Sequence, residues 1–271
     1  MANKSALINV MDAAARKAAR RLLRDFGEVE QLQVSRKGPA DFVSSADTKA
    51  EETLVFELQA VRPDYSFLLE EGGEIKGKDL SNRWIIDPLD GTTNFLHGIP
   101  HFAISIALER DNEIFAGVVY EPTRDEMFYA EKGQGAFVND RRLRVSGRNM
   151  MAEAVLATGI PFRGRGSPEE MALFNRELMT IMPEVAGVRR LGAASLDLAY
   201  VAAGRYEAFW ERGLAAWDMA AGLIIAREAG AIVSETDLGS RMLKTGSVLA
   251  SNGLLHDPVA ALLRKARNKQ S

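Results

Sequence analysis

The sequence has no cysteine and few aromatic side chains. Among its 271 residues, histidine occurs 3 times and aromatic residues make up 7%. The lack of cysteine excludes disulfide bonds and thiolate zinc sites. No apolar run approaches the ~20 residues of a membrane-spanning helix, and the N-terminus lacks the apolar core of a signal peptide. We therefore expect a cytoplasmic protein with no membrane partner.

Neither sign of charge dominates the chain. Lysine and arginine together number 34 against 37 aspartate and glutamate, which gives a formal net charge of −3. A nucleic-acid-binding surface needs clustered positive charge, so we expect no nucleic-acid partner. Hydrophobic content of 46% and charged content of 26% are those of an ordinary globular protein of one or two domains.

One stretch, Trp84 to Phe95, carries most of the chemical information. It reads WIIDPLDGTTNF, an apolar strand followed by Asp87 and Asp90 on either side of a proline turn. Because proline fixes its own φ and restricts the preceding residue, we expect the strand to stop at Asp87. The two carboxylates and the Leu89 carbonyl are hard oxygen ligands, which suit Mg²⁺.

The residues that follow predict an anion site. Gly91 to Asn94 has the character of a helix start, whose backbone N–H groups can hold an anion. A cation site and an anion site this close together suit a phosphate ester bridged to a metal. From the short string DPLDG alone, however, an ordinary turn with Asp90 as a helix N-cap is the favoured interpretation.

The full twelve-residue string resembles the first motif of the inositol monophosphatases, Mg²⁺-dependent phosphatases that share a fold with fructose-1,6-bisphosphatase. Residues 66–71, SFLLEE, resemble the family's strand that ends in a metal-binding glutamate, and residues 216–222, AWDMAAG, resemble its second motif. Matching segments run from Asp41 to Asn252, and the bacterial members fit best. The resemblance implies an α+β fold, a layered αβαβα sandwich with an antiparallel first sheet and a mixed second sheet.

The resemblance also implies the roles of individual residues. Thr92, with Asp47 behind it, would orient the attacking water on a metal that Glu70 helps to hold, so these three are the expected catalytic residues. Two or three Mg²⁺ ions are expected per site. The implied metal ligands are Glu70, Asp87, the Leu89 carbonyl, Asp90 and Asp218. The implied substrate contacts are Asp90, Gly91, Thr92, Arg189, Gly192, Ala193, Ala194, Glu211 and Asp218.

From the residues alone, several of these positions have plainer interpretations. Asp218 begins an apolar helix, where an acid is favoured by the helix dipole, and Asp47 can serve only to cap the helix that begins at Ser45. Glu70 and its neighbour can be exposed charge. The matches to the family motifs favour the metal role for Asp218. We interpret His97 and His101 as structural or interface residues, because paired histidines suit Zn²⁺ and nothing else in the pattern does.

The periodicity of the chain changes near its middle. Residues 6–26 and 45–61 carry apolar side chains at helical spacing, and short strand-like runs then predict an antiparallel meander. From residue 152, strands and helices alternate. We expect an N-terminal half, residues 1–150, with the metal and phosphate site, and a C-terminal half, residues 151–271, that completes it. The segment from Arg36 to Pro39 is polar and rich in turn residues, which predicts a mobile loop. The resemblance implies that this loop approaches the active site, where Arg36 and Lys37 can screen phosphate charge; a plain surface loop is an equal alternative.

The expected function is Mg²⁺-dependent hydrolysis of a phosphate monoester. The resemblance implies myo-inositol 1-phosphate as substrate, inhibition by lithium and a homodimer. Glu211 stands seven residues before Asp218, as the family's hydroxyl-binding glutamate does, and this favours a small phosphorylated polyol. The alternatives are the same chemistry on fructose 1,6-bisphosphate, a nucleotide 3′-phosphate or histidinol phosphate, and a regulatory protein that keeps the fold.

Overall fold

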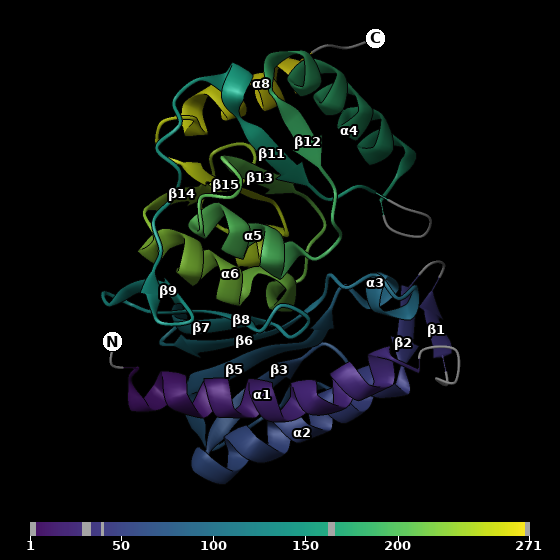
Figure 1. Cartoon of the computed structure of the whole chain (residues 1–271), viewed down its shortest axis with the longest axis vertical. Helices are drawn as coiled ribbons and strands as arrows, with labels where there is room; N and C mark the ends of the chain where they lie inside the picture. Colours follow the sequence, from purple (N-terminus) through teal and green to yellow (C-terminus); the bar gives the residue numbers. More distant parts are fainter. Residues whose placement is uncertain (1–3, 29–33, 39–40, 162–165, 269–271) are drawn as a thin grey trace.

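The computed structural model describes residues 4–28, 34–38, 41–161 and 166–268, with the backbone alone for 34–38 and 41–44. Helices and sheets alternate in layers (Figure 1). The two outer helical layers are α1 (Ala6–Phe26) with α2 (Ser45–Val61), and α4 (Pro168–Ile181) with α8 (His256–Asn268). Between the two sheets lie α5 (Ala194–Ala202) and α6 (Ala216–Glu228). The predicted αβαβα sandwich is confirmed.

The first sheet has eight strands in the order β10-β9-β8-β7-β6-β5-β3-β4. All neighbours are antiparallel except β3 and β5, so the predicted antiparallel sheet is correct for every pair but one. The left-handed backbone of Asp111 and Asn112 makes one of its tight turns, which such residues tolerate. The strands are β3 (Tyr65–Leu69), β4 (Gly73–Ile75), β5 (Asp79–Asp90), β6 (Ala103–Arg110), β7 (Glu113–Glu121), β8 (Glu126–Glu131), β9 (Gly135–Val138) and β10 (Arg141–Arg142).

The second sheet has five strands in the order β12-β11-β13-β15-β14. Its strand β11 runs parallel to both neighbours, whereas β15 runs antiparallel to β13 and β14, so the predicted mixed sheet is confirmed. The strands are β11 (Val155–Thr158), β12 (Gly187–Arg189), β13 (Ala208–Glu211), β14 (Ala231–Ser234) and β15 (Val248–Asn252). The described residues also form two 3₁₀ turns (Met151–Glu153 and Met182–Glu184) and the short helix α7 (Met242–Thr245).

Small residues allow the central helices to approach their neighbours closely. A Cβ added at Gly222 of α6 would lie 2.6 Å from Leu198 Cβ of α5, and one added at Gly117 of β7 would lie 2.8 Å from Ala221 Cα. Any larger side chain at these glycines would push α6 away from α5 and the first sheet. This packing holds α6, at whose start Asp218 lies, against α5 and the first sheet.

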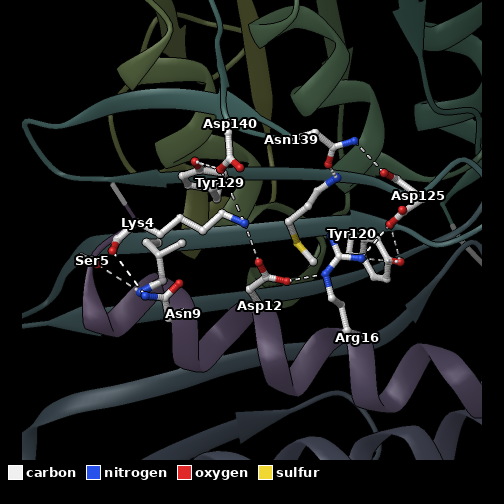
Figure 2. Close-up of polar contacts among 12 residues, drawn as sticks. Lys4, Ser5, Asn9, Asp12, Arg16, Tyr120, Asp125, Tyr129, Asn139 and Asp140 are labelled. Carbon is white, nitrogen blue, oxygen red and sulfur yellow. Dashed lines mark hydrogen bonds and ion pairs between the residues drawn. The ribbon is translucent and has the colours of Figure 1, made fainter. Parts of the chain in front are cut away.

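The helix α1 is fixed to the first sheet by a polar seam (Figure 2). Asp12 receives Lys4 Nζ at 2.6 Å and Arg16 Nε at 2.7 Å, and Arg16 Nη1 reaches Asp125 at 2.7 Å. The Tyr120 hydroxyl donates to the same Asp125 at 2.9 Å. These contacts use Lys4, just before α1, and Arg16 of α1 for packing. Among the described residues, none of the helices has the length and apolar character needed to span a bilayer.

Two local predictions are wrong. β5 does not stop at Asp87 but continues to Asp90, because Asp87 pairs with Ser105 and Asp90 with Ala103, which leaves Pro88 in a bulge where proline is tolerated. Residues 36–38 of the segment predicted as a mobile loop instead lie in β1 (Val34–Gly38), paired antiparallel with β2 (Asp41–Ser44), whereas Pro39 lies outside the described residues. The side chains of Arg36 and Lys37 lie outside the described part, so the interpretation that they screen phosphate charge stays untested.

Candidate active site

The predicted turn after β5 is tight and needs a glycine. Gly91 has a φ of 96° and precedes α3 (Thr92–Leu96). A Cβ at this position would lie 3.0 Å from the His101 carbonyl oxygen, so a side chain would be strained and crowded. Within the bulge, the Leu89 amide donates to Asp87 Oδ1 at 2.9 Å. The bulge at the end of β5, directly before this turn, therefore presents two carboxylates and a carbonyl within four residues.

Four acidic residues from three elements come together at this turn. Asp87 is 2% exposed, and burial together with Glu70, Asp90 and Asp218 raises its pKa well above the ordinary range. Burial also raises the pKa of Asp90 to about 7; hydrogen bonds from Ser195 lower it and the charge of Asp218 raises it. Like charges have this effect only at short range. The structure thus brings Glu70, which directly follows β3, and Asp218 of α6 to the central turn.

The chemistry of this cluster fits a divalent metal. Four carboxylates and one carbonyl are hard oxygen donors, and a cation would offset the charge repulsion that raises their pKa values. One oxygen of Asp218 accepts from the Ala215 amide at 2.7 Å, and one of Asp90 accepts from Ser195. Within the described ranges, no three such groups are already arranged as a metal site. The donor set fits Mg²⁺, but its side chains must still turn toward a common point.

The Thr92 hydroxyl lies between two acceptors beside the cluster. Its Oγ1 is 3.2 Å from Asp47 Oδ1 and 3.0 Å from the Leu89 carbonyl oxygen. A hydroxyl has one proton, so it donates to one of them at a time and can accept a hydrogen bond in return. Asp47 is fully buried in the first turn of α2, which keeps its carboxylate beside the hydroxyl. This geometry can orient a water molecule next to the acidic cluster.

The expected substrate residues outside the turn come from the end of β12, the start of α5 and the end of β13. Gly192 has a φ of 84°, and the buried residues Ala193 and Ala194 follow at the start of α5, so they can offer only backbone to a ligand. Glu211 ends β13 and lines a cavity next to Gly159. Arg189 is exposed at the end of β12 and donates to the Val188 carbonyl at 3.2 Å. None of its described hydrogen bonds or ion pairs reaches the acidic cluster.

Three polar residues at the site were missed by sequence reasoning. Ser195 donates to Asp90 from both its amide and its hydroxyl, and Asn94 Nδ2 donates to the carbonyls of His101 and Leu191, each at 2.8 Å. Asp197 is 1% exposed, with Oδ1 lacking a hydrogen-bond partner among the described residues. Its pKa is raised by burial and by Glu211. The sequence signal available for Asp197 was its position as the one acid within the otherwise mostly apolar string ASLDLAYV.

The two histidines near the motif stand apart from this chemistry. His97 Nδ1 lies 2.8 Å from the Thr93 carbonyl oxygen, within the α3 turn. His101 is buried, and burial lowers its pKa to about 4. His101 is therefore neutral, and its ring packs edge-on against the Tyr200 ring, as expected of a structural residue.

Comparisons with known proteins agree along nearly the whole chain. The sequence model of the inositol monophosphatase family matches residues 3–268. An inositol-1-monophosphatase of Mesorhizobium japonicum is 56% identical over 262 residues, 97% of each chain. The Nus factor SuhB of Pseudomonas aeruginosa is 44% identical over 248 residues, 91% of each chain. The crystal structure of the extragenic suppressor protein suhB from Bartonella henselae has a TM-score of 0.93 and 52% identity, and covers 96% of this chain and 99% of that one.

These matches confirm the resemblance and the expectation of an enzyme. The family match and the relatives more than half identical are independent of the site geometry described above, and both point to phosphatase chemistry. The chain belongs to the inositol monophosphatase family.

Proposed function

We propose that this enzyme hydrolyses inositol monophosphates with the help of Mg²⁺. The observation that carries the proposal is the buried acidic cluster beside the Thr92–Asp47 pair. Glu70, Asp87, Asp90, Asp218 and the Leu89 carbonyl would hold the metal ions. When bound, Mg²⁺ supplies the positive charge that stabilises phosphate oxygens and makes water a better nucleophile.

The protein's own groups would orient the reactants. The Thr92 hydroxyl donates to Asp47 and accepts a hydrogen bond from the attacking water, which directs the water's lone pair at phosphorus. The backbone amides of Gly91 and Thr92, at the start of α3, hold the phosphate oxygens. Ser195 holds one Asp90 oxygen and so orients that carboxylate.

The polyol part of the substrate would lie against Glu211 and the backbone of residues 192–194. A carboxylate accepts hydrogen bonds from hydroxyl groups, and such charge-assisted bonds are the stronger kind. The relative of 56% identity is named for the inositol 1-monophosphate reaction, which supports this substrate. We also propose that the enzyme is a homodimer and acts in the cytoplasm. Sedimentation of the purified enzyme tests the dimer.

The test is phosphate release from a panel of esters at saturating Mg²⁺. The panel contains myo-inositol 1-phosphate, fructose 1,6-bisphosphate, a nucleotide 3′-phosphate, histidinol phosphate and an aryl phosphate. We expect the highest kcat/KM for inositol 1-phosphate, no turnover in excess EDTA, and inhibition by Li⁺. A higher kcat/KM on another ester would transfer the proposal to that substrate, and full turnover in EDTA would contradict it.

A regulatory role is the second candidate, because a relative of 44% identity is named a Nus factor. The expectation of no nucleic-acid partner is untested. The greater identity to inositol-1-monophosphatases favours catalysis as the primary role. A folded protein that binds Mg²⁺ but hydrolyses none of the esters would favour the regulatory candidate.

A further inference from the structure

The carboxylate of Glu211 occupies the space in which a side chain at position 159 would begin. A Cβ added at Gly159 would lie 1.9 Å from Glu211 Cδ and 2.0 and 2.1 Å from its two oxygens. Gly159 is not among the residues with a positive φ, so its backbone would accept any L-residue. The constraint on a side chain here therefore comes from the Glu211 carboxylate and not from the backbone conformation.

The two residues are neighbours because of the second sheet. β11 and β13 are parallel, and Thr158 of β11 pairs with Trp210 of β13. The residues that follow this pair, Gly159 and Glu211, are therefore neighbours. Thr158 Oγ1 also donates to the Trp210 carbonyl at 2.8 Å, which holds the two strand ends together. The backbone distance between positions 159 and 211 is thereby fixed.

The residues on either side of Glu211 are anchored to α4 by one buried carboxylate. Glu177 is fully buried; its Oε2 accepts from Trp210 Nε1 at 3.2 Å and from Arg212 Nη1 at 2.8 Å. Its Oε1 lies 2.6 Å from Arg212 Nη2. With both neighbours held, the backbone at Glu211 cannot retreat from an added side chain. The Glu211 side chain, which is flexible, must move instead.

We propose that Gly159 is a specificity-determining residue. Because it has no side chain, it leaves the space that the Glu211 carboxylate occupies when it binds the hydroxyl groups of the substrate. The inference rests on the proposed role of Glu211 in binding a polyol. The plainer interpretation, a glycine that merely ends β11, requires no effect of Gly159 on substrate choice.

The test compares Gly159→Ala, Glu211→Ala and the double variant on inositol 1-phosphate and on an aryl phosphate that has no polyol. We expect Gly159→Ala to lower kcat/KM for inositol 1-phosphate by about ten- to a hundredfold, the range of a charge-assisted hydrogen bond. The loss should lie in KM, and turnover of the aryl phosphate should stay within about twofold. In the Glu211→Ala background, Gly159→Ala should cause no further loss.

Gly147→Ala is the matched control, because a Cβ there meets nothing within 4 Å and its φ is not positive. It should leave both substrates unaffected. If Gly159→Ala lowers the melting temperature, the double variant should recover it, since the clash is with Glu211.

Two results overturn the inference alone: normal kinetics of Gly159→Ala when Glu211→Ala is impaired, or a loss in the double variant equal to the product of the single losses. A Glu211→Ala variant with normal kinetics on inositol 1-phosphate would instead remove the proposed polyol contact, and the inference with it.

Discussion

Ser195 holds one oxygen of Asp90 with two hydrogen bonds, from its amide at 2.8 Å and from its hydroxyl at 2.5 Å. The two residues are 105 positions apart, and the contact joins the start of α5 to the end of β5. A carboxylate stabilised in this way keeps a lower pKa than its burial alone would give. Ser195 thus helps Asp90 to remain ionised and available to a cation.

Ser195→Ala should weaken Mg²⁺ binding. Losing the hydroxyl removes a hydrogen bond to a charged group, worth about 1.5–3 kcal/mol, and raises the pKa of Asp90 further. At pH 6.5 we expect the Mg²⁺ dissociation constant to rise about tenfold in a calorimetric titration. Ser81→Ala, at an exposed site, is the control. Unchanged affinity in Ser195→Ala would show that the amide alone orients Asp90.

Asp218→Asn should lower kcat by orders of magnitude without unfolding the protein. The substitution removes a charge from the acidic cluster. The side-chain oxygen of Asn can still accept the hydrogen bond from the amide of Ala215, the N-cap residue of α6. If Asp218 served only the helix dipole, its loss would change stability by just ~0.3–1 kcal/mol and leave turnover near normal. Turnover at saturating Mg²⁺ and the melting temperature, measured on the same sample, separate these two roles.

The Mg²⁺-free protein should lose stability as pH rises from about 4 to about 7. The pKa of Asp90 is raised from 3.8 to about 7 in the folded chain, chiefly by burial, and that of Asp87 is raised as well. In this window the folded state binds more protons than the unfolded state, so the free energy of unfolding falls with increasing pH. Melting temperatures in EDTA at pH 5 and pH 7.5 measure the effect.

Two controls identify the groups that cause this loss of stability with rising pH. Saturating Mg²⁺ at pH 7.5 should restore much of the lost stability, because a ligand that binds the folded state stabilises it. Asp90→Asn has no proton to lose at this position and should show a smaller pH dependence in EDTA. An unchanged pH dependence in Asp90→Asn would place the titrating groups elsewhere.

Features set by local sequence could be predicted closely. The helix α1 begins and ends at the predicted residues, since Ser5 Oγ accepts from the Ile8 amide at 3.1 Å and Gly27 follows the last turn. The helix start predicted at Gly91 to Asn94 is also present, as α3 with Gly91 as its N-cap. The assignment of metal ligands came from resemblance and stays a prediction, although the structure brings those acids together.

Features set by strand pairing could not be predicted. Pro88 lies in a bulge because β6 pairs on both sides of it, and no rule about proline alone gives that register. The contact of Gly159 with Glu211 depends on the parallel pairing of β11 and β13, and that of Ser195 with Asp90 on the packing of α5. Each of these contacts joins segments that only the tertiary fold brings together.

Thr92→Val should separate water orientation from metal binding. Valine keeps the shape of threonine but has no hydroxyl, so the contacts with Asp47 Oδ1 at 3.2 Å and with the Leu89 carbonyl at 3.0 Å are both lost. We expect kcat to fall about a hundredfold or more, the size of a lost proton-transfer or orienting group, with Mg²⁺ affinity within about threefold of the unmodified enzyme. Thr92→Ser keeps the hydroxyl and should retain most of the activity.

An equal loss of turnover in Thr92→Val and Thr92→Ser would mean that the methyl group, through packing of the α3 turn, matters more than the hydroxyl. A large loss of Mg²⁺ affinity in Thr92→Val would mean instead that the hydroxyl acts by holding the Leu89 carbonyl in place for the metal.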